Sequence, residues 1–203
     1  MNDYFADKME IEILDFATDK RKIWEQNHQL YSVIFEITPK CNFRCVHCYL
    51  RHHHSSEELS YNEIINIIDI LYEKEVLFLT LTGGDVFTRS DFLDIYLYAK
   101  KKGFIIEIYT NGALINDEII NTFEQYPPLL VDISLYGACE ETYQKVTGIS
   151  GGFDKVIHNI ESLLNAGIRV SVKAPVLNLY YHELSKMKKI AKSFGIPFRT
   201  GFE

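Results

Sequence analysis

Six short apolar segments recur along the chain from residue 33 onward, and the stretches between them carry helical signals. The segments are Val33–Ile37, Val76–Leu81, Phe104–Tyr109, Leu129–Leu135, Arg169–Ala174 and Pro197–Phe202. Strands that alternate with helices at about thirty residues per unit form βα units, whose strands run parallel with right-handed crossovers. Six units are too few for a closed eight-stranded barrel, which takes about 250 residues. We therefore predict an α/β fold, a partial (β/α)6 TIM-like barrel with parallel strands.

Capping signals indicate where the intervening helices begin and end. Ser60-Tyr-Asn-Glu63 is a capping-box sequence, and apolar residues at helical spacing follow it. Ser90 and Asn116 are the expected N-caps of the next two helices. After a glycine-rich loop at residues 147–152, two more helices are expected, one before Gly167 and one over Tyr181–Phe194.

Three of the four cysteines, Cys41, Cys45 and Cys48, are crowded into one short stretch after the first predicted strand. Pro39 ends that strand, because proline lacks the backbone N–H that a sheet ladder needs. Three thiolates from one loop can hold an iron–sulfur cluster or another soft metal. A structural zinc site normally takes four ligands, whereas three cysteines on a cubane cluster leave one iron open. The spacing favours a cluster, and zinc or unreactive core thiols remain as alternatives.

Other polar and glycine residues stand at the ends of the later predicted strands. Gly83-Gly84-Asp85 follows the second strand and Asn111 the third, while Ser134 and Lys173 lie near the ends of the fourth and fifth. In parallel α/β folds the site lies at the carboxyl ends of the strands. These residues and the three cysteines are therefore expected to form one active site.

Composition excludes several classes of protein. The formal net charge of −7 argues against a surface that neutralises nucleic-acid phosphates. No apolar run approaches the ~20 residues of a membrane span. Residues 1–7 are acidic and lack the basic start and apolar core of a signal peptide. We expect a protein of the reducing cytoplasm, with no nucleic-acid or membrane partner.

The motifs resemble those of the radical S-adenosylmethionine (SAM) superfamily. Cys41-Asn-Phe-Arg-Cys45-Val-His-Cys48 is similar to its C-x3-C-x-φ-C signature, with His47 at the usually aromatic φ position. Gly83-Gly84-Asp85 is similar to the GGE motif, with aspartate in place of the usual glutamate. Residues 132–137, with Thr142-Tyr143 and 146–148, resemble the branch that carries a C-terminal SPASM domain, many members of which modify peptides or protein side chains.

This resemblance implies a 4Fe–4S cluster on Cys41, Cys45 and Cys48, with SAM on the open iron. Reductive cleavage of SAM would give a 5′-deoxyadenosyl radical that abstracts hydrogen from a substrate, most readily a ribosomal peptide or a protein side chain. The electron would come from a donor such as flavodoxin or ferredoxin. The residues that the resemblance assigns to SAM binding are His47, Gly83, Gly84, Asp85, Asn111, Ser134 and Lys173.

Two alternative functions stay open at this point. One is radical SAM chemistry on a small molecule in cofactor biosynthesis. The other is a non-catalytic iron–sulfur or zinc-binding module, against which the separate strand-end motifs count, because a mere carrier needs no Gly83-Gly84 turn.

The predicted domain division is an N-terminal strap or lid at residues 1–31 and a radical SAM core at residues 32–203. A SPASM extension would need several further cysteines, and only Cys139 remains, so the sequence is expected to be either the core of a longer enzyme or a minimal member. Cys139 is interpreted as a plain, partly buried thiol. His52-His53-His54 is interpreted as a solvated loop.

Overall fold

The computed structural model describes residue 22, residues 24–50 and residues 58–201. Its centre is one six-stranded sheet in the order β1-β2-β3-β4-β5-β6, with every neighbouring pair parallel. The strands are β1 (Ser32–Thr38), β2 (Phe78–Gly83), β3 (Ile105–Thr110), β4 (Leu130–Ser134), β5 (Val170–Ala174) and β6 (Phe198–Thr200). No pairing joins β6 back to β1 among these strands, so the sheet is a partial barrel, as predicted.

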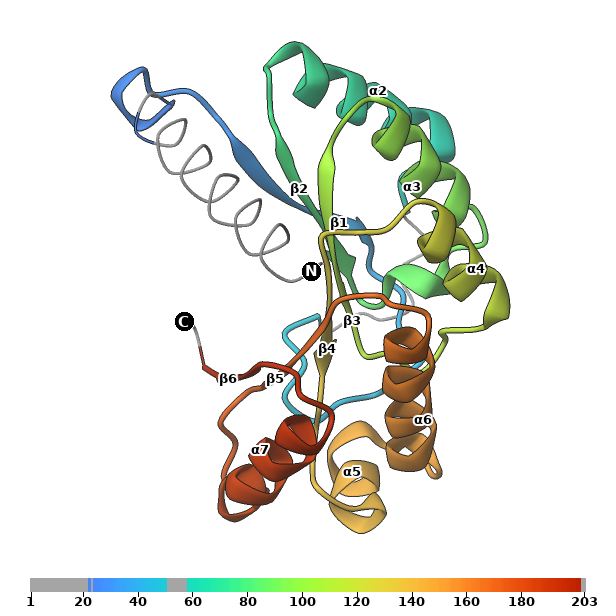
Figure 1. The fold of residues 1–203 in the computed structure, drawn as a ribbon, viewed down its shortest axis with the longest axis vertical. Helices are drawn as coiled ribbons and strands as arrows, with labels where there is room; N and C mark the ends of the chain where they lie inside the picture. Colours follow the sequence, from blue (N-terminus) through green and yellow to red (C-terminus); the bar gives the residue numbers. More distant parts are fainter. Residues whose placement is uncertain (1–21, 23, 51–57, 202–203) are drawn as a thin grey trace, which may run out of the picture.

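Helices connect successive strands and cover one face of the sheet. They are α2 (Tyr61–Glu73), α3 (Phe92–Lys101), α4 (Asp117–Gln125), α5 (Glu140–Thr147), α6 (Gly152–Asn165) and α7 (Leu184–Ser193), with short 3-10 turns η1 (Val86–Thr88) and η2 (Tyr181–Glu183). Figure 1 shows α2, α3, α4 and α6 along the same side of the strands. This is the arrangement that right-handed βαβ crossovers produce.

The alternation of side chains along each strand divides the core from the concave face. Ile106 and Ile108 of β3 are fully buried against the helices, whereas Glu107 between them lies on the opposite face. The same helix-facing layer contains Leu79, Leu81, Val131, Ile133, Val170 and Val172. The concave face carries most of the polar and charged side chains of the strands, among them Glu107 and Asp132, together with a few apolar ones such as Ile34. It is the face on which a substrate can enter a partial barrel.

The capping predictions are largely confirmed. Ser60 forms the capping box with Glu63, and the Asn116 side chain accepts a 3.0 Å hydrogen bond from the Ile119 amide. Ser90 is not an N-cap, and that prediction was wrong. The turn η1 follows Asp85, and α3 begins one residue later than expected, with Asp91 at its N-cap position.

Helix α5 was not anticipated, because its eight residues are mostly polar and charged and carry little apolar periodicity. It lies beside α6, and its buried residues are Tyr143, Val146 and Thr147. Both the strap proposed for residues 1–31 (apart from residue 22 and residues 24–31) and the His52–His54 tract lie outside the described residues.

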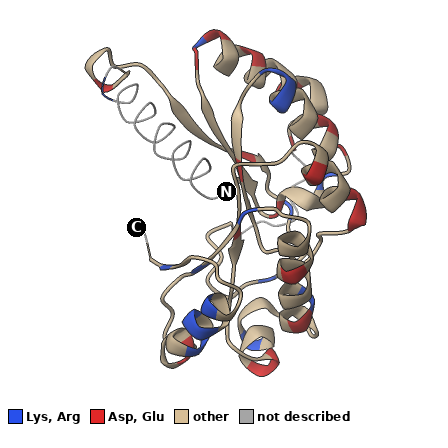
Figure 2. Ribbon diagram, viewed as in Figure 1, with Lys and Arg blue, Asp and Glu red and all other residues tan. Residues whose placement is uncertain are grey.

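Charge is unevenly distributed over the helices. Figure 2 colours the ribbon by residue type: acidic residues are spread over the helices from α2 to α6, whereas basic residues lie on α7 and at the end of α3. In the part of the chain that the structure describes, no helix has the length and apolar character needed to cross a membrane.

Candidate functional site

The cysteine loop leaves the carboxyl end of β1 and is fixed at both sides by backbone hydrogen bonds. On one side, the Gly84 amide donates to the Thr38 carbonyl and the Asp85 amide to the Lys40 carbonyl, each at 2.8 Å. On the other side, the loop amides of residues 44 and 46 donate to the carbonyls of residues 147 and 146, each at 2.9 Å. The loop is thus held between the end of β2 and the end of α5.

Gly83 and Gly84 allow the first of these contacts. A Cβ on Gly84 would lie 2.1 Å from the Lys40 carbonyl oxygen, and one on Gly83 would lie 2.2 Å from the Thr38 carbonyl oxygen. Gly83 also has φ +147°, a conformation that favours glycine. The sequence gives these glycines a role against SAM, which stays a prediction. The structure adds a second reason, the close approach of two stretches of backbone.

The three loop thiols are free and partly buried, and no disulfide joins them. Burial, with a smaller contribution from Asp85 and Cys48, raises the pKa of Cys41 to about 11. Burial and the neighbouring thiols Cys41 and Cys48 raise the pKa of Cys45 to about 12. A bound cation would offset this cost, because coordination deprotonates a thiol outright. Among the described residues, no group of three or more His, Cys, Asp and Glu side chains is set to hold a single metal ion.

A cluster of aromatic rings packs against the inner side of the cysteine loop. Phe43 is fully buried and packs edge-on against Tyr136 and Tyr143, with ring centres 6.5 and 6.1 Å apart. The His47 ring is tilted by 52° against Tyr136, with ring centres 5.2 Å apart, and its Nδ1 is buried with no hydrogen-bond partner among the described residues. Burial lowers the pKa of His47, so the neutral imidazole is favoured. The loop therefore has a buried, aromatic side and, among the described residues, a ring nitrogen of His47 without a hydrogen-bond partner.

Asp85 joins the glycine turn to the end of β3 from inside the protein. Its carboxylate is fully buried and accepts hydrogen bonds from the Phe87 amide (3.1 Å), the Thr110 hydroxyl (2.7 Å) and the Asn111 amide (2.8 Å). Burial raises the pKa of Asp85, and these three hydrogen bonds oppose that rise. The Asp85 carboxylate binds only groups inside the protein among the described residues. The contact with SAM predicted for Asp85 is therefore expected from its backbone, not from its side chain.

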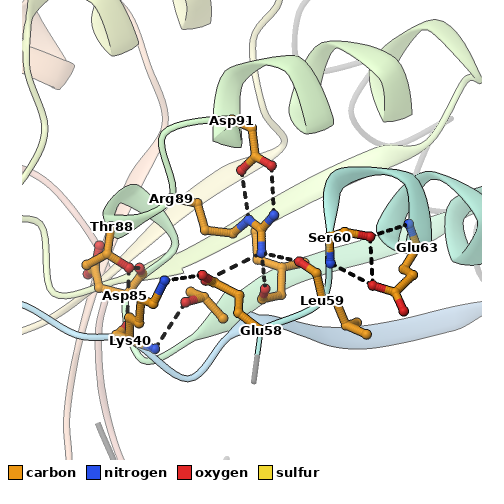
Figure 3. Close-up of polar contacts among 11 residues, drawn as sticks. Lys40, Glu58, Leu59, Ser60, Glu63, Asp85, Thr88, Arg89 and Asp91 are labelled. Carbon is orange, nitrogen blue, oxygen red and sulfur yellow. Dashed lines mark hydrogen bonds and ion pairs between the residues drawn. The ribbon is translucent and has the colours of Figure 1, made fainter. Parts of the chain in front are cut away.

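A polar cluster of Lys40, Glu58, Arg89 and Asp91, drawn in Figure 3, lies where the cysteine loop leaves β1. The Arg89 guanidinium donates to the Ile37 carbonyl at 3.1 Å, to the Leu59 carbonyl at 2.8 Å and to both carboxylate oxygens of Asp91. Lys40 forms an ion pair with Glu58. Ile37 precedes the cysteine loop and Leu59 precedes α2, so one arginine joins the two ends of the intervening segment.

The concave face carries a second charged group, centred on Asp132. Its carboxylate lies 3.2 Å from the Lys173 ammonium and 3.0 Å from the Arg199 guanidinium, and it accepts a hydrogen bond from Ser171. The Lys173 ammonium also lies 3.4 Å from the centre of the Tyr109 ring. Burial lowers the pKa of Lys173, and the nearby Asp132 opposes this.

The predicted site residues gather at one edge of the sheet. The cysteine loop, the glycine turn and Asn111 are in direct contact, whereas Ser134 pairs with Lys173 across β4 and β5. Cys139 is exposed rather than partly buried, so that expectation was wrong; its Sγ lies 3.5 Å from the Thr142 hydroxyl. Sequence reasoning missed Arg89 and Phe43. An arginine inside a loop and a phenylalanine between ligands carry no periodic signal.

Comparison with known proteins agrees with this architecture. The crystal structure of Streptococcus suis SuiB bound to precursor peptide SuiA superposes with a TM-score of 0.76 at 14% identity, over 94% of this chain and 44% of that one. The AdoMet-dependent heme synthase of Methanosarcina barkeri is 29% identical over 80% of this chain. The antilisterial bacteriocin subtilosin biosynthesis protein AlbA of Bacillus subtilis is 30% identical over 79% of it.

The chain spans less than half the length of these relatives, 47% of the heme synthase and 36% of AlbA. The model of the Radical SAM superfamily matches residues 35–193, and this chain belongs to that superfamily.

Proposed function

We propose that this chain is the catalytic core of a radical SAM enzyme that modifies a peptide or protein side chain. The observation that carries the proposal is the convergence of Cys41, Cys45 and Cys48 with the Gly83-Gly84 turn at the carboxyl edge of the parallel sheet. The chain belongs to a superfamily of enzymes, and these three cysteines supply a donor set of the kind that leaves one iron of a cubane cluster open.

In this proposal the three thiolates hold a 4Fe–4S cluster. When bound, the cluster and SAM would supply radical chemistry, the abstraction of a hydrogen atom from the substrate. The protein fixes the loop through its backbone hydrogen bonds. Phe43 and Tyr136 exclude water from its inner side, and His47 offers a buried ring nitrogen beside it. Gly83, Gly84, Asp85 through its backbone, Asn111, Ser134 and Lys173 are the further residues proposed to contact SAM.

Two observations support a peptide as the substrate. AlbA, named for bacteriocin biosynthesis, is 30% identical to this chain. The concave face also offers charged and hydrogen-bonding groups on neighbouring strands, including Tyr109, Lys173 and Arg199. Such groups suit the amides and polar side chains of a peptide. A flavodoxin or ferredoxin is the proposed electron donor, and residues 1–31 are the proposed strap over the core.

A second candidate is a small-molecule substrate of porphyrin type. It is favoured by the 29% identity to an AdoMet-dependent heme synthase, a value close to that for AlbA. Both candidates share the same cluster and the same cleavage of SAM, and they differ only in what lies on the concave face.

The test is anaerobic reconstitution with iron and sulfide, followed by dithionite and SAM and by chromatography for 5′-deoxyadenosine. We expect about four irons per chain and production of 5′-deoxyadenosine. A Cys41→Ala, Cys45→Ala, Cys48→Ala triple variant should lose both, whereas Cys139→Ala should stay within about twofold of the parent, because Cys139 lies outside the loop. Zinc without iron after anaerobic purification would contradict the proposal.

Substrate class is then tested with two probes, a short peptide encoded beside the gene and an iron porphyrin. Deuterium from the labelled probe should appear in 5′-deoxyadenosine when the probe is the substrate. Transfer from the porphyrin alone would replace the peptide proposal with the second candidate.

A further inference from the structure

Two N–H donors converge on the sulfur of Cys41. The Phe43 amide lies 3.4 Å from Sγ, and the Asn111 side-chain Nδ2 lies 3.7 Å from the same atom. The first donor belongs to the cysteine loop itself. The second comes from the end of β3, seventy residues away in the chain. Distances of this length are ordinary for N–H donors to sulfur, whose radius is larger than that of oxygen.

The orientation of the Asn111 amide follows from its other contacts. Its Oδ1 accepts a 2.9 Å hydrogen bond from the Ala113 amide, which can only donate. The Nδ2 end must therefore point the other way, where it donates to Asn42 Oδ1 at 2.7 Å and toward Cys41. A flipped amide would place two donors against each other at Ala113.

The buried carboxylate of Asp85 fixes the backbone of Asn111. The Asn111 amide donates to the buried carboxylate of Asp85 at 2.8 Å, and the Thr110 hydroxyl donates to the same carboxylate oxygen. Asn111 is only 5% exposed. A chain of hydrogen bonds thus connects Asp85 of the glycine turn, Asn111 at the end of β3 and Cys41, one ligand of the proposed cluster.

We propose that Asn111 is a positioning residue that orients Cys41 and sets the reduction potential of the cluster. This inference depends on the proposed function, since it requires the cluster. Hydrogen bonds to a cluster sulfur stabilise the reduced, more negative state and so raise the midpoint potential. Asn111 acts through Cys41 in this role, which differs from the SAM contact predicted for it from the sequence.

The experiment is a dye-mediated redox titration of the reconstituted protein without SAM, followed by EPR. Asn111→Ser keeps an acceptor for the Ala113 amide but cannot reach Cys41, and the nearly isosteric Asn111→Asp removes the donor. Both variants should have a more negative midpoint potential than the parent. The matched control is Asn159→Ser. Asn159 is also a buried asparagine, 6% exposed, and it donates to the neighbouring Gly112 carbonyl at 2.7 Å without contacting a cysteine.

The outcomes separate this inference from the proposed function. A parent protein that forms no cluster refutes both. A shifted potential in the Asn111 variants and an unshifted one in Asn159→Ser supports the inference. So does loss of iron from folded Asn111 variants, if Asn159→Ser stays loaded. Unchanged potentials in loaded Asn111 variants overturn it while leaving the proposed function intact. Failure of both Asn111 variants to fold also overturns it, because the residue would then serve the fold as a whole.

Discussion

Gly84 packs directly against the carbonyl of Lys40, the residue before the first cysteine, so closely that a Cβ on Gly84 would lie 2.1 Å from that oxygen. The contact is accompanied by the hydrogen bond from the Gly84 amide to the Thr38 carbonyl. The Lys40 carbonyl also accepts a hydrogen bond from the Asp85 amide. Its oxygen therefore cannot move away without displacing the start of the cysteine loop.

Gly84→Ala should therefore reduce iron loading as well as SAM affinity. Overpacking of this kind typically costs about 1–3 kcal/mol of stability. Iron content after anaerobic reconstitution measures loading, SAM titration of the EPR signal measures affinity, and thermal melting measures stability. The control is Gly167→Ala, where a Cβ would meet nothing within 4 Å and only the positive φ is strained. A fully loaded Gly84→Ala with weakened SAM binding would show instead that this turn serves the cofactor alone.

Asp85→Glu tests whether the aspartate is suited to its buried position. The carboxylate is fully buried with three short donor contacts, so an added methylene has no free space. We expect about 1–3 kcal/mol lower stability, measured by denaturant melting. Asp85→Asn should be destabilised too, because an amide would set an NH2 group against one of the donors. A glutamate variant as stable as the parent would mean that the site relaxes readily.

Arg89→Met removes the buried guanidinium that joins Ile37 to Leu59. Its side chain is 5% exposed, and the loss leaves Asp91 and two carbonyls without their donor. Breaking a buried pair costs about 3–5 kcal/mol, and Arg89→Lys should recover little of it because lysine cannot reproduce the planar fork. Lys102→Met, at a surface ion pair with Asp69, should change the melting temperature little. Equal effects at both positions would contradict this.

Glu183→Gln tests a pH-dependent contact between η2 and the segment after β4. Burial opposes ionisation of Glu183, but hydrogen bonds from the Thr142 hydroxyl and the Ala138 amide prevail, so its pKa is lowered from the ordinary 4.5. A lowered folded pKa contributes stability above the unfolded value that is lost as the pH falls through the folded one. The parent should exceed the variant by about 1 kcal/mol at pH 7.

That difference should shrink as the pH falls below 4.5, because the unfolded parent then binds a proton at Glu183 before the folded parent does. Urea melts of both proteins between pH 3 and pH 7 measure it. Subtracting the two stability curves removes the contribution of the carboxyl groups that both proteins share. A difference that stays constant over this range would show that Glu183 is not ionised in a lowered-pKa state.

The sheet could be predicted from the sequence because each strand is a short apolar run that ends at glycine, proline or polar residues. The approximate site followed from that, since parallel strands bring Cys41, Gly83 and Asn111 to one edge. Strand limits were displaced by one or two residues, as at β2, which begins at Phe78 instead of Val76.

Other features could not be predicted because they depend on contacts between distant residues. Nothing local in the sequence says that the Asp85 carboxylate faces inward to Thr110, or that Arg89 reaches Ile37 across 52 positions. Helix α5 is polar enough to resemble a loop, and only its packing on α6 identifies it. Periodicity reports which face of an element is buried, not which polar groups meet.

Lys173→Met tests whether Lys173 contacts SAM or serves only in its ion pair with Asp132. Its ammonium lies between Asp132 and the Tyr109 ring, and the SAM contact predicted for it is a separate matter. Lys173→Met should weaken SAM binding at least tenfold, which is about 1.4 kcal/mol. The control is Ser171→Ala, which removes another partner of Asp132 without removing a cation. SAM titration of the EPR signal measures both. Parental affinity in Lys173→Met would confine the lysine to its ion pair with Asp132, and a matching loss in Ser171→Ala would assign the effect to displacement of Asp132.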